Sequence, residues 1–492
     1  MLPRVPLIVI LGATGSGKTK LSLGIARKYG GEIISADSMQ VYKGLDIITA
    51  KATPEEQSQA PHHLLDVIDP LKNFSVVDFR NKALKIINDL FQANKMPVIV
   101  GGTNYYIESI LWDVLVDKVP QQSSDNENSA SDSEESPAKK LRIDKTLIDE
   151  TKSTSIKHLL ETVESIASKQ DQSEVSDIKM LCAAVGSDKF NFITDDLTIP
   201  SVELHEVLKR VDPKMADRLH PNNRRKIIRA LQVIVQEGRL LSDILEEQQS
   251  MDGGCTVGGP LRYPNTLIFW VKAEQKILDE RLNKRVDKMI EDGLLKELTD
   301  FHQRYNEERI EVNQQPDYTK GIFQSIGFKE FHDYLILNED DQKSSNGQKL
   351  LAKGIEDLKM VTRRYARKQN RWIQNRFLGN PKRQVPPLYA LDSSDVSKWD
   401  ENVETPAFEI IDCYISQTEC THRPLPVNTI EKGEPLSKCK TYVCETCKRT
   451  FVGDLQWNVH LKSGKHHRML KKLNKQQNMQ TKQNVDQEKQ DQ

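Results

Sequence analysis

The chain has 492 residues, of which 29% are charged, and its formal net charge is −1. This length suits two or three domains, and the balanced charge excludes a chain that is basic throughout, so any nucleic-acid site must be local. No run approaches the roughly 18 apolar residues of a membrane-spanning helix, and only Met1–Pro6 precede the first predicted strand, too few for a signal or transit peptide. We therefore expect a cytoplasmic protein without a membrane segment, and mitochondrial and nuclear pools stay open.

The first predicted element is a short apolar strand, Leu7–Leu11, which leads into the sequence GATGSGKT. This run fits the phosphate-binding loop G-x-x-x-x-G-K-[ST] at every fixed position. In such a loop the backbone N–H groups surround a di- or triphosphate, the lysine adds positive charge, and the final hydroxyl reaches Mg²⁺. Apolar residues at helical spacing follow over 20–29, so the N-terminus of a helix should face the phosphates. The expected phosphate ligands are Gly12, Thr14, Gly15, Ser16, Gly17, Lys18 and Thr19, with Thr19 also on the Mg²⁺.

Two more strands are predicted at 32–36 and 97–100, and they end at Asp37 and at a Gly-Gly-Thr run that closes with Thr103. Strands that alternate with helices predict an α/β fold of the P-loop nucleoside-triphosphatase type, a parallel sheet with helices on both faces. Ligands of such sheets bind outside the carboxyl ends of the strands, where these groups should meet. ATP-hydrolysing enzymes of this type usually end a second apolar strand with an acid that holds Mg²⁺, whereas strand 97–100 ends in Gly-Gly-Thr. The residues therefore favour an enzyme whose loop holds a leaving group while Asp37 accepts a proton, and a metal-side or helix-capping role for Asp37 stays open.

The composition changes beyond the first 120 residues. We expect a largely disordered, acidic and serine-rich insertion at 121–200, because its start lacks the apolar residues needed to form a core. A short basic run inside it is either a nuclear-import signal or a solvated charge run. Residues 201–395 should form a helical insertion region and the rest of the core, including a buried strand at 266–271. A linker is expected over 396–440 and a disordered tail over 471–492.

A small zinc finger is predicted at 441–470. The spacing C-x₂-C-x₁₂-H-x₅-H matches a site with two cysteine and two histidine ligands. A single finger of this kind with following basic residues more often grips an RNA helix by its shape than reads DNA bases, and a protein-binding role stays open. The expected structural Zn²⁺ ligands are Cys444, Cys447, His460 and His466, with His467 as the alternative fourth ligand.

The helix predicted over 362–377 carries cations three and four residues apart, interleaved with Tyr365, Trp372 and Phe377. Positive charge combined with planar rings suits an RNA backbone and unstacked bases. A solvated cationic face above an aromatic core contact is the alternative.

Several long motifs, in this order, closely resemble the tRNA dimethylallyltransferases, also called tRNA isopentenyltransferases. They are GATGSGKT at 12–19, the run from Ser35 to Ile47, GGTNYY at 101–106, HPNN at 220–223, QSIGFKE at 324–330 and TRRYA at 362–366. The appended finger resembles that of the eukaryotic branch. The chain departs from the family pattern in its acidic insertion and at Lys226, where many members have arginine.

The resemblance implies transfer of a dimethylallyl group from dimethylallyl diphosphate to N6 of the adenosine at tRNA position 37, which gives N6-(dimethylallyl)adenosine. It implies that the phosphate loop holds the diphosphate with Mg²⁺, that Asp37 accepts the N6 proton, and that Thr103 hydrogen-bonds the oxygen of the leaving group. The implied partner is the anticodon stem-loop, whose target base leaves the stack, and nothing in the sequence demands a dimer, so we expect a monomer. The expected tRNA contacts are Asp37, Ser38, Met39, Gln40, Arg225, Lys226, Arg229, Arg364 and Lys368, although the cations of 224–229 suit the diphosphate equally.

Three other readings stay open at this stage. A P-loop small-molecule kinase would transfer phosphate, and an adenylate isopentenyltransferase would prenylate a free nucleotide, which needs neither a finger nor a basic helix. An RNA-binding regulator would keep the phosphate loop only as a remnant.

Overall fold

A computed structural model describes residues 5–113, 200–237, 239–251, 254–255, 258–311, 321–379, 383–427 and 441–475. The chain divides into two compact units, one of residues 1–114 and 251–431 and one of 115–250 and 432–492. Within the described residues, no helix combines the length and apolarity that crossing a membrane requires. The predicted insertion at 121–200 and the predicted tail at 471–492 lie almost wholly outside the described residues.

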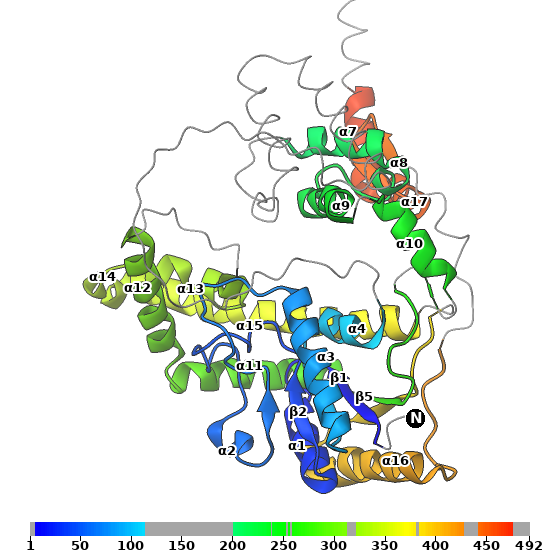
Figure 1. Cartoon of the computed structure of the whole chain (residues 1–492). Helices are drawn as coiled ribbons and strands as arrows, with labels where there is room; N and C mark the ends of the chain where they lie inside the picture. Colours follow the sequence, from blue (N-terminus) through cyan, green and yellow to red (C-terminus); the bar gives the residue numbers. More distant parts are fainter. Residues whose placement is uncertain are drawn as a thin grey trace, which may run out of the picture. The chain divides into compact units, whose positions relative to one another are not determined.

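The first unit is built on a six-stranded sheet in which every neighbouring pair is parallel (Figure 1). The strand order is β3-β2-β4-β1-β5-β6, so β1 lies inside the sheet between β4 and β5. The strands are β1 (Leu7–Gly12), β2 (Glu32–Ser35), β3 (His62–His63), β4 (Pro97–Val100), β5 (Thr266–Lys272) and β6 (Leu388–Asp392). The predicted doubly covered parallel sheet is confirmed, and the carboxyl ends of β1, β2 and β4 lie at the same edge.

Alternate residues of β1 belong to different hydrophobic cores, as the pleat of a strand requires. Leu7 and Val9 pack with α3 (Val76–Gln92) and α4 (Asn104–Leu111). Ile8 packs on the other face with α1 (Lys18–Tyr29) and α16 (Thr405–Ser416). Because both faces are covered, the central strands β1 and β4 are apolar along their whole length.

A group of helices beside the sheet forms a third core, which contains the loop after β2. Val41 and Ile48 of that loop are buried among Phe301, Phe328 and Phe331. The helices and turns of the first unit not given above are α2 (Pro54–Gln57), α11 (Gln275–Glu291), α12 (Leu294–Glu311), η2 (Gly321–Gln324), α13 (Phe328–Leu335), α14 (Glu339–Lys343), α15 (Ser345–Ile373), η3 (Gln374–Leu378), η4 (Val396–Lys398) and η5 (Asp400–Glu404).

The expected linker at 396–440 is wrong over its first part. Val403, Ala407 and Ile410 are buried in the core that α1 shares, and the segment forms η5 and α16. Their spacing of three and four residues is that of an amphipathic helix. Residues 428–440 lie outside the described part.

In its described residues, the second unit contains four helices from the insertion region together with the finger. They are α7 (Ser201–Val211), α8 (Pro213–Ala216), α9 (Arg224–Glu237) and α10 (Leu241–Ser250), and the finger consists of β7 (Thr441–Cys444), β8 (Arg449–Val452) and α17 (Asp454–Leu461). Asp212 caps α8 by accepting the Met215 N–H at 3.0 Å. The ring Nε2 of His220 lies 3.1 Å from the Thr450 carbonyl oxygen, so the HPNN turn touches the finger.

Candidate functional site

The turn between β1 and α1 is a phosphate loop that only glycine could build at two points. A Cβ on Gly17 would lie 2.6 Å from the Trp399 ring, and one on Gly12 would lie 2.5 Å from the Val271 carbonyl oxygen. Gly17 also has a φ of 93°, in the left-handed region. No side chain caps α1 at its start, so the N–H groups of its first turn remain available to an anion.

The Ser16 hydroxyl adds a donor to this loop. The residue is buried, and its Oγ has no hydrogen-bond partner among the described residues. A buried polar atom without a partner is costly, and a diphosphate oxygen would satisfy it. Thr19 is exposed one position beyond Lys18, and its contact with Mg²⁺ stays a prediction.

Three charged groups lie within electrostatic reach of one another beside the loop. Desolvation lowers the pKa of Lys18 to about 8, although the nearby negative charge of Asp37 raises it in part. Desolvation raises the pKa of Asp37 above its ordinary value. The Met39 N–H, which donates to Asp37 Oδ1 at 3.0 Å, and the charges of Lys18 and Arg285 lower this pKa, but by less than burial raises it. Desolvation likewise lowers the pKa of Arg285. A carboxylate with a raised pKa is a better base near neutral pH, and two cations beside it suit a diphosphate.

Arg285 is a residue that the sequence analysis missed. It is one of two arginines on α11, a charged helix, and nothing in its local spacing separates it from Arg281. Only the packing of α11 against the rest of the unit brings its charge to Asp37.

Thr103 is at the start of α4, immediately after β4. Its N–H donates to the Ala36 carbonyl at 3.1 Å, which joins the ends of β2 and β4. The Ser38 N–H donates to the Thr103 hydroxyl at 3.0 Å, and that hydroxyl donates to Ser38 Oγ at 3.1 Å. Thr103 and the turn after β2 are thus directly connected, as the strand ends predicted.

Helix α15 brings two further groups to this edge of the sheet. The Thr14 N–H donates to Gln369 Oε1 at 2.8 Å, and Gln369 Nε2 donates to the Gly102 carbonyl at 2.9 Å. The Tyr365 hydroxyl lies close enough to the Thr103 and Gln369 side chains to interact with both. One helix face therefore braces the phosphate loop and the Thr103 segment together, a role that the sequence analysis did not assign.

The structure changes the interpretation of the aromatic residues on α15 and on η3, which follows it. Phe377 is fully buried in the core, and Tyr365 faces Thr103. Trp372 is partly exposed, and its indole N–H donates to Glu108. Arg364 and Lys368 are exposed and remain available as expected. For Phe377 the alternative, an aromatic core contact, therefore holds, whereas stacking of Tyr365 or Trp372 on RNA bases stays a prediction.

The cations expected at 224–229 lie on α9, in the second unit. Arg225 and Lys226 are exposed, and Arg229 is half-buried. The phosphate loop belongs to the first unit.

Gln40 is engaged by its own loop, although we expected it to line the path of the base. Its Oε1 accepts from the Ser35 hydroxyl at 2.9 Å, and its Nε2 donates to the carbonyls of Thr49 and Ala50 at 3.2 and 3.1 Å. Ser38 and Met39 are half-buried in the same turn as Asp37. The Gln40 side chain thus fixes the shape of the turn.

The predicted zinc ligands converge. One ligand atom from each of Cys444, Cys447, His460 and His466 lies within 4.8 Å of the others. His460 Nε2 is buried with no hydrogen-bond partner among the described residues, as a metal ligand would be. His467 instead places Nδ1 3.0 Å from the Ser463 carbonyl, which makes His466 the fourth member of the set. Two thiolates and two imidazoles fit Zn²⁺.

Comparison with known proteins gives a consistent result. The IPP transferase family model matches residues 40–179 and 193–376, and a model of C2H2-type zinc fingers matches 442–466. A human protein named tRNA dimethylallyltransferase is 44% identical over 95% of this chain and 86% of its own length. A Schizosaccharomyces pombe protein of that name is 31% identical and covers 94% of each chain.

A solved structure gives the same result for the whole chain. It is described as a eukaryotic dimethylallyltransferase acting on tRNA, is 26% identical, and matches with a TM-score of 0.69 over 97% of this chain and 100% of its own. This chain belongs to the IPP transferase family.

Proposed function

We propose that this chain is a tRNA dimethylallyltransferase that transfers the dimethylallyl group of dimethylallyl diphosphate (the donor) to N6 of adenosine at tRNA position 37. The observation that carries the proposal is the meeting of a phosphate loop with the Asp37 carboxyl, whose pKa is raised, and the Thr103 hydroxyl. These are the groups needed to hold a diphosphate, accept a proton and stabilise a leaving oxygen. Relatives with this name cover the chain almost completely.

The diphosphate end of the donor binds to the phosphate loop. The N–H groups at the start of α1 and the Ser16 hydroxyl donate to its oxygens, and Lys18 and Arg285 supply positive charge. Both cations gain most when the carbon–oxygen bond breaks, because the diphosphate then carries additional negative charge. Mg²⁺, held through Thr19, would neutralise further charge on the diphosphate.

Transfer requires one bond to form and one to break. The N6 nitrogen attacks the first carbon of the dimethylallyl group, and the electrons of the carbon–oxygen bond leave with the diphosphate. The N6 proton goes to Asp37, whose raised pKa suits it to accept that proton. The Thr103 hydroxyl turns its proton from Ser38 Oγ to the departing oxygen, and Tyr365 keeps Thr103 in place.

The tRNA side of the site has basic and structural parts. We assign Arg364 and Lys368 of α15, with Arg225 and Lys226 of α9, to phosphates of the anticodon stem-loop, because these four side chains are exposed. Contacts of this kind position RNA without reading its sequence. The finger, with Zn²⁺ on its two cysteines and two histidines, would hold the stem by its shape.

The test combines radiolabelled donor with transcribed tRNA and compares the wild type with Asp37→Asn. We expect labelled tRNA from the wild type and a kcat lower by about 10²–10⁴-fold in the variant, because the base is lost, with tRNA affinity unchanged. The matched control is Asp412→Asn, which removes a carboxylate that contacts Lys28 and Tyr29 instead. Full activity in Asp37→Asn would refute the assignment of the base.

Substrate competition separates the alternatives. Label on free adenylate but not on tRNA would indicate an adenylate isopentenyltransferase, and phosphate transfer from ATP without prenyl transfer would indicate a kinase. Truncation before Lys440 should raise KM for tRNA without removing transfer at saturating tRNA. If the truncated protein lost transfer at saturating tRNA, the finger would have a role beyond binding.

A further inference from the structure

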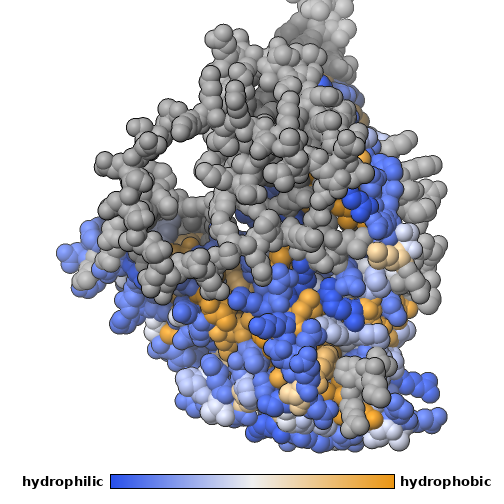
Figure 2. All heavy atoms as spheres, in the orientation of Figure 1, coloured by the Kyte–Doolittle hydropathy of each residue, from blue (hydrophilic) through white to orange (hydrophobic). Residues whose placement is uncertain are grey.

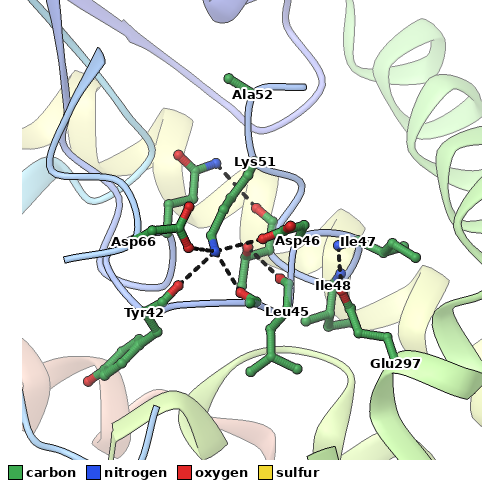
Figure 3. A network of polar contacts seen from close by, with 12 residues as sticks. Tyr42, Leu45, Asp46, Ile47, Ile48, Lys51, Ala52, Asp66 and Glu297 are labelled. Atoms are coloured by element: carbon green, nitrogen blue, oxygen red, sulfur yellow. Dashed lines mark hydrogen bonds and ion pairs between the residues drawn. The ribbon is translucent and has the colours of Figure 1, made fainter. Parts of the chain in front are cut away.

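The loop after β2 encloses a buried ammonium group. The Lys51 side chain is 2% exposed, and its Nζ donates to the carbonyls of Tyr42 and Gly44 at 2.7 and 2.6 Å. It also lies 2.8 Å from an Asp46 carboxylate oxygen and 2.5 Å from one of Asp66 (Figure 3). An ammonium has three protons, so these four oxygens use its full capacity. Lys51 therefore acts on the protein itself and is not available to a substrate.

The backbone around this ammonium is in a conformation that it would not adopt alone. Leu45 and Ala50 have φ values of 57° and 49°, and Leu64 and Asp66 have values of 62° and 53°. Residues other than glycine rarely occupy this left-handed region, and they persist there where the surroundings fix them. The ammonium lies where the two loops converge, so it compensates this strain and the mutual repulsion of the two carboxylates.

Gln40 connects the ammonium cluster to the turn that carries the proposed base. Its carbonyl accepts the Asp66 N–H at 3.2 Å, while its side chain bridges Ser35 at the end of β2 and the carbonyls of Thr49 and Ala50. A displacement of either loop therefore moves the turn that begins at Asp37.

The far side of the loop is fixed independently. Glu297 of α12 accepts the N–H groups of Ile47 and Ile48, each at 2.9 Å (Figure 3). These two hydrogen bonds hold Ile47 and Ile48 to the helical core. The segment between Asp37 and Ile47 is held instead by the contacts of Lys51.

We propose that Lys51 is a positioning residue for prenyl transfer, which holds the Asp37–Gln40 turn in the geometry that receives the target adenine. The proposal rests on the proposed function. Lys51 acts by geometry, because the charges that act on the Asp37 carboxyl are those of Lys18 and Arg285. The donor site, built from the phosphate loop, should not depend on it.

The test is Lys51→Met, which keeps the length of the side chain and removes the charge. We expect kcat to fall by about 10²-fold, since a misplacement near 1 Å costs that much, while KM for the donor and the pH at which Asp37 titrates stay as in the wild type. Donor-binding sites are counted by equilibrium dialysis and kcat is expressed per site, so unfolded protein does not contribute. Lys95→Met is the control, since Lys95 pairs with Glu32 at the opposite end of β2, at 2.6 Å.

A fluorescent stem-loop provides a second measurement, which a general loss of protein stability would not change. With 2-aminopurine in place of the target adenosine, extrusion of the base on binding raises its fluorescence. We expect Lys51→Met to bind this stem-loop with wild-type affinity and a smaller rise in fluorescence. A folded variant with wild-type kcat and a full rise would overturn the proposal, as would a KM for the donor that increases as kcat falls.

Asp66→Asn provides a second route if Lys51→Met does not fold. Asparagine tolerates the left-handed conformation of this position, so the variant removes one charge without new strain. We expect a smaller loss of kcat than in Lys51→Met, and a double variant no worse than Lys51→Met alone. Additive losses, or unchanged kcat in Asp66→Asn, would refute a shared network. Absence of transfer in the wild type would instead refute the proposed function.

Discussion

Replacing Lys18 with methionine should stabilise the protein while abolishing donor binding. Burial lowers the pKa of Lys18 from 10.5 to about 8. At about 1.4 kcal/mol per pKa unit, keeping this side chain charged in the folded state costs about 3 kcal/mol at neutral pH. This cost is a net figure that already includes the attraction between Lys18 and Asp37. We expect a net stabilisation of about 1–3 kcal/mol, or a rise in Tm of about 2–6 °C.

The pH dependence identifies the cause of this gain. Below about pH 8 Lys18 is protonated in both the folded and the unfolded chain, so the cost is present in full. Between about pH 8 and 10.5 the folded protein has lost the proton while the unfolded chain still binds it, and the cost declines. Only well above pH 10.5, the pKa of the unfolded chain, are both states neutral. The difference in Tm between Lys18→Met and the wild type should therefore be largest at pH 7 and decline steadily from about pH 8 to beyond pH 10.5.

Differential scanning fluorimetry across this pH range measures the effect, with and without the donor. The donor should raise the Tm of the wild type and leave that of Lys18→Met unchanged. The control is Lys20→Met, which removes an exposed cation from the same helix, one that lies over the Trp399 ring at 4.8 Å. That change should not raise the Tm. A Tm of Lys18→Met at or below the wild-type value at pH 7, or a gap that does not vary with pH, would refute the reasoning.

Three further outcomes are expected. In steady-state assays, kcat/KM for the donor should decline above about pH 8, because Lys18 of the free enzyme then loses its charge; a profile flat to pH 10 would count against that role. Tyr365→Phe should lower kcat/KM about fivefold, the worth of one hydrogen bond, with KM for tRNA unchanged, whereas Tyr389→Phe on β6 should have no effect; equal losses would indicate a general packing effect. Native mass spectrometry should find zinc lost from His466→Ala and retained by His467→Ala, since only the former belongs to the cluster; the reverse would reassign the fourth ligand.

The sequence alone determined the features that depend on neighbours along the chain. The phosphate loop, the apolar strands around it and the four zinc ligands are short patterns with fixed spacing, and each is a property of one turn, one strand or one finger. Because parallel strands end at one edge of their sheet, even the meeting of Lys18, Asp37 and Thr103 was expected from their places after the carboxyl ends of three strands.

Tertiary structure decided which distant groups complete the site. Gln369 lies 355 positions from Thr14, whose N–H it accepts, and neither Arg285 nor Tyr365 differs in local pattern from its neighbours. The charge cluster of Lys51 and the burial of α16 likewise depend on how loops and helices pack. Helical periodicity determines which residues share a face of a helix, but only the packing determines what that face contacts. The contacts that hold the proposed catalytic groups in place could therefore not be predicted from the sequence.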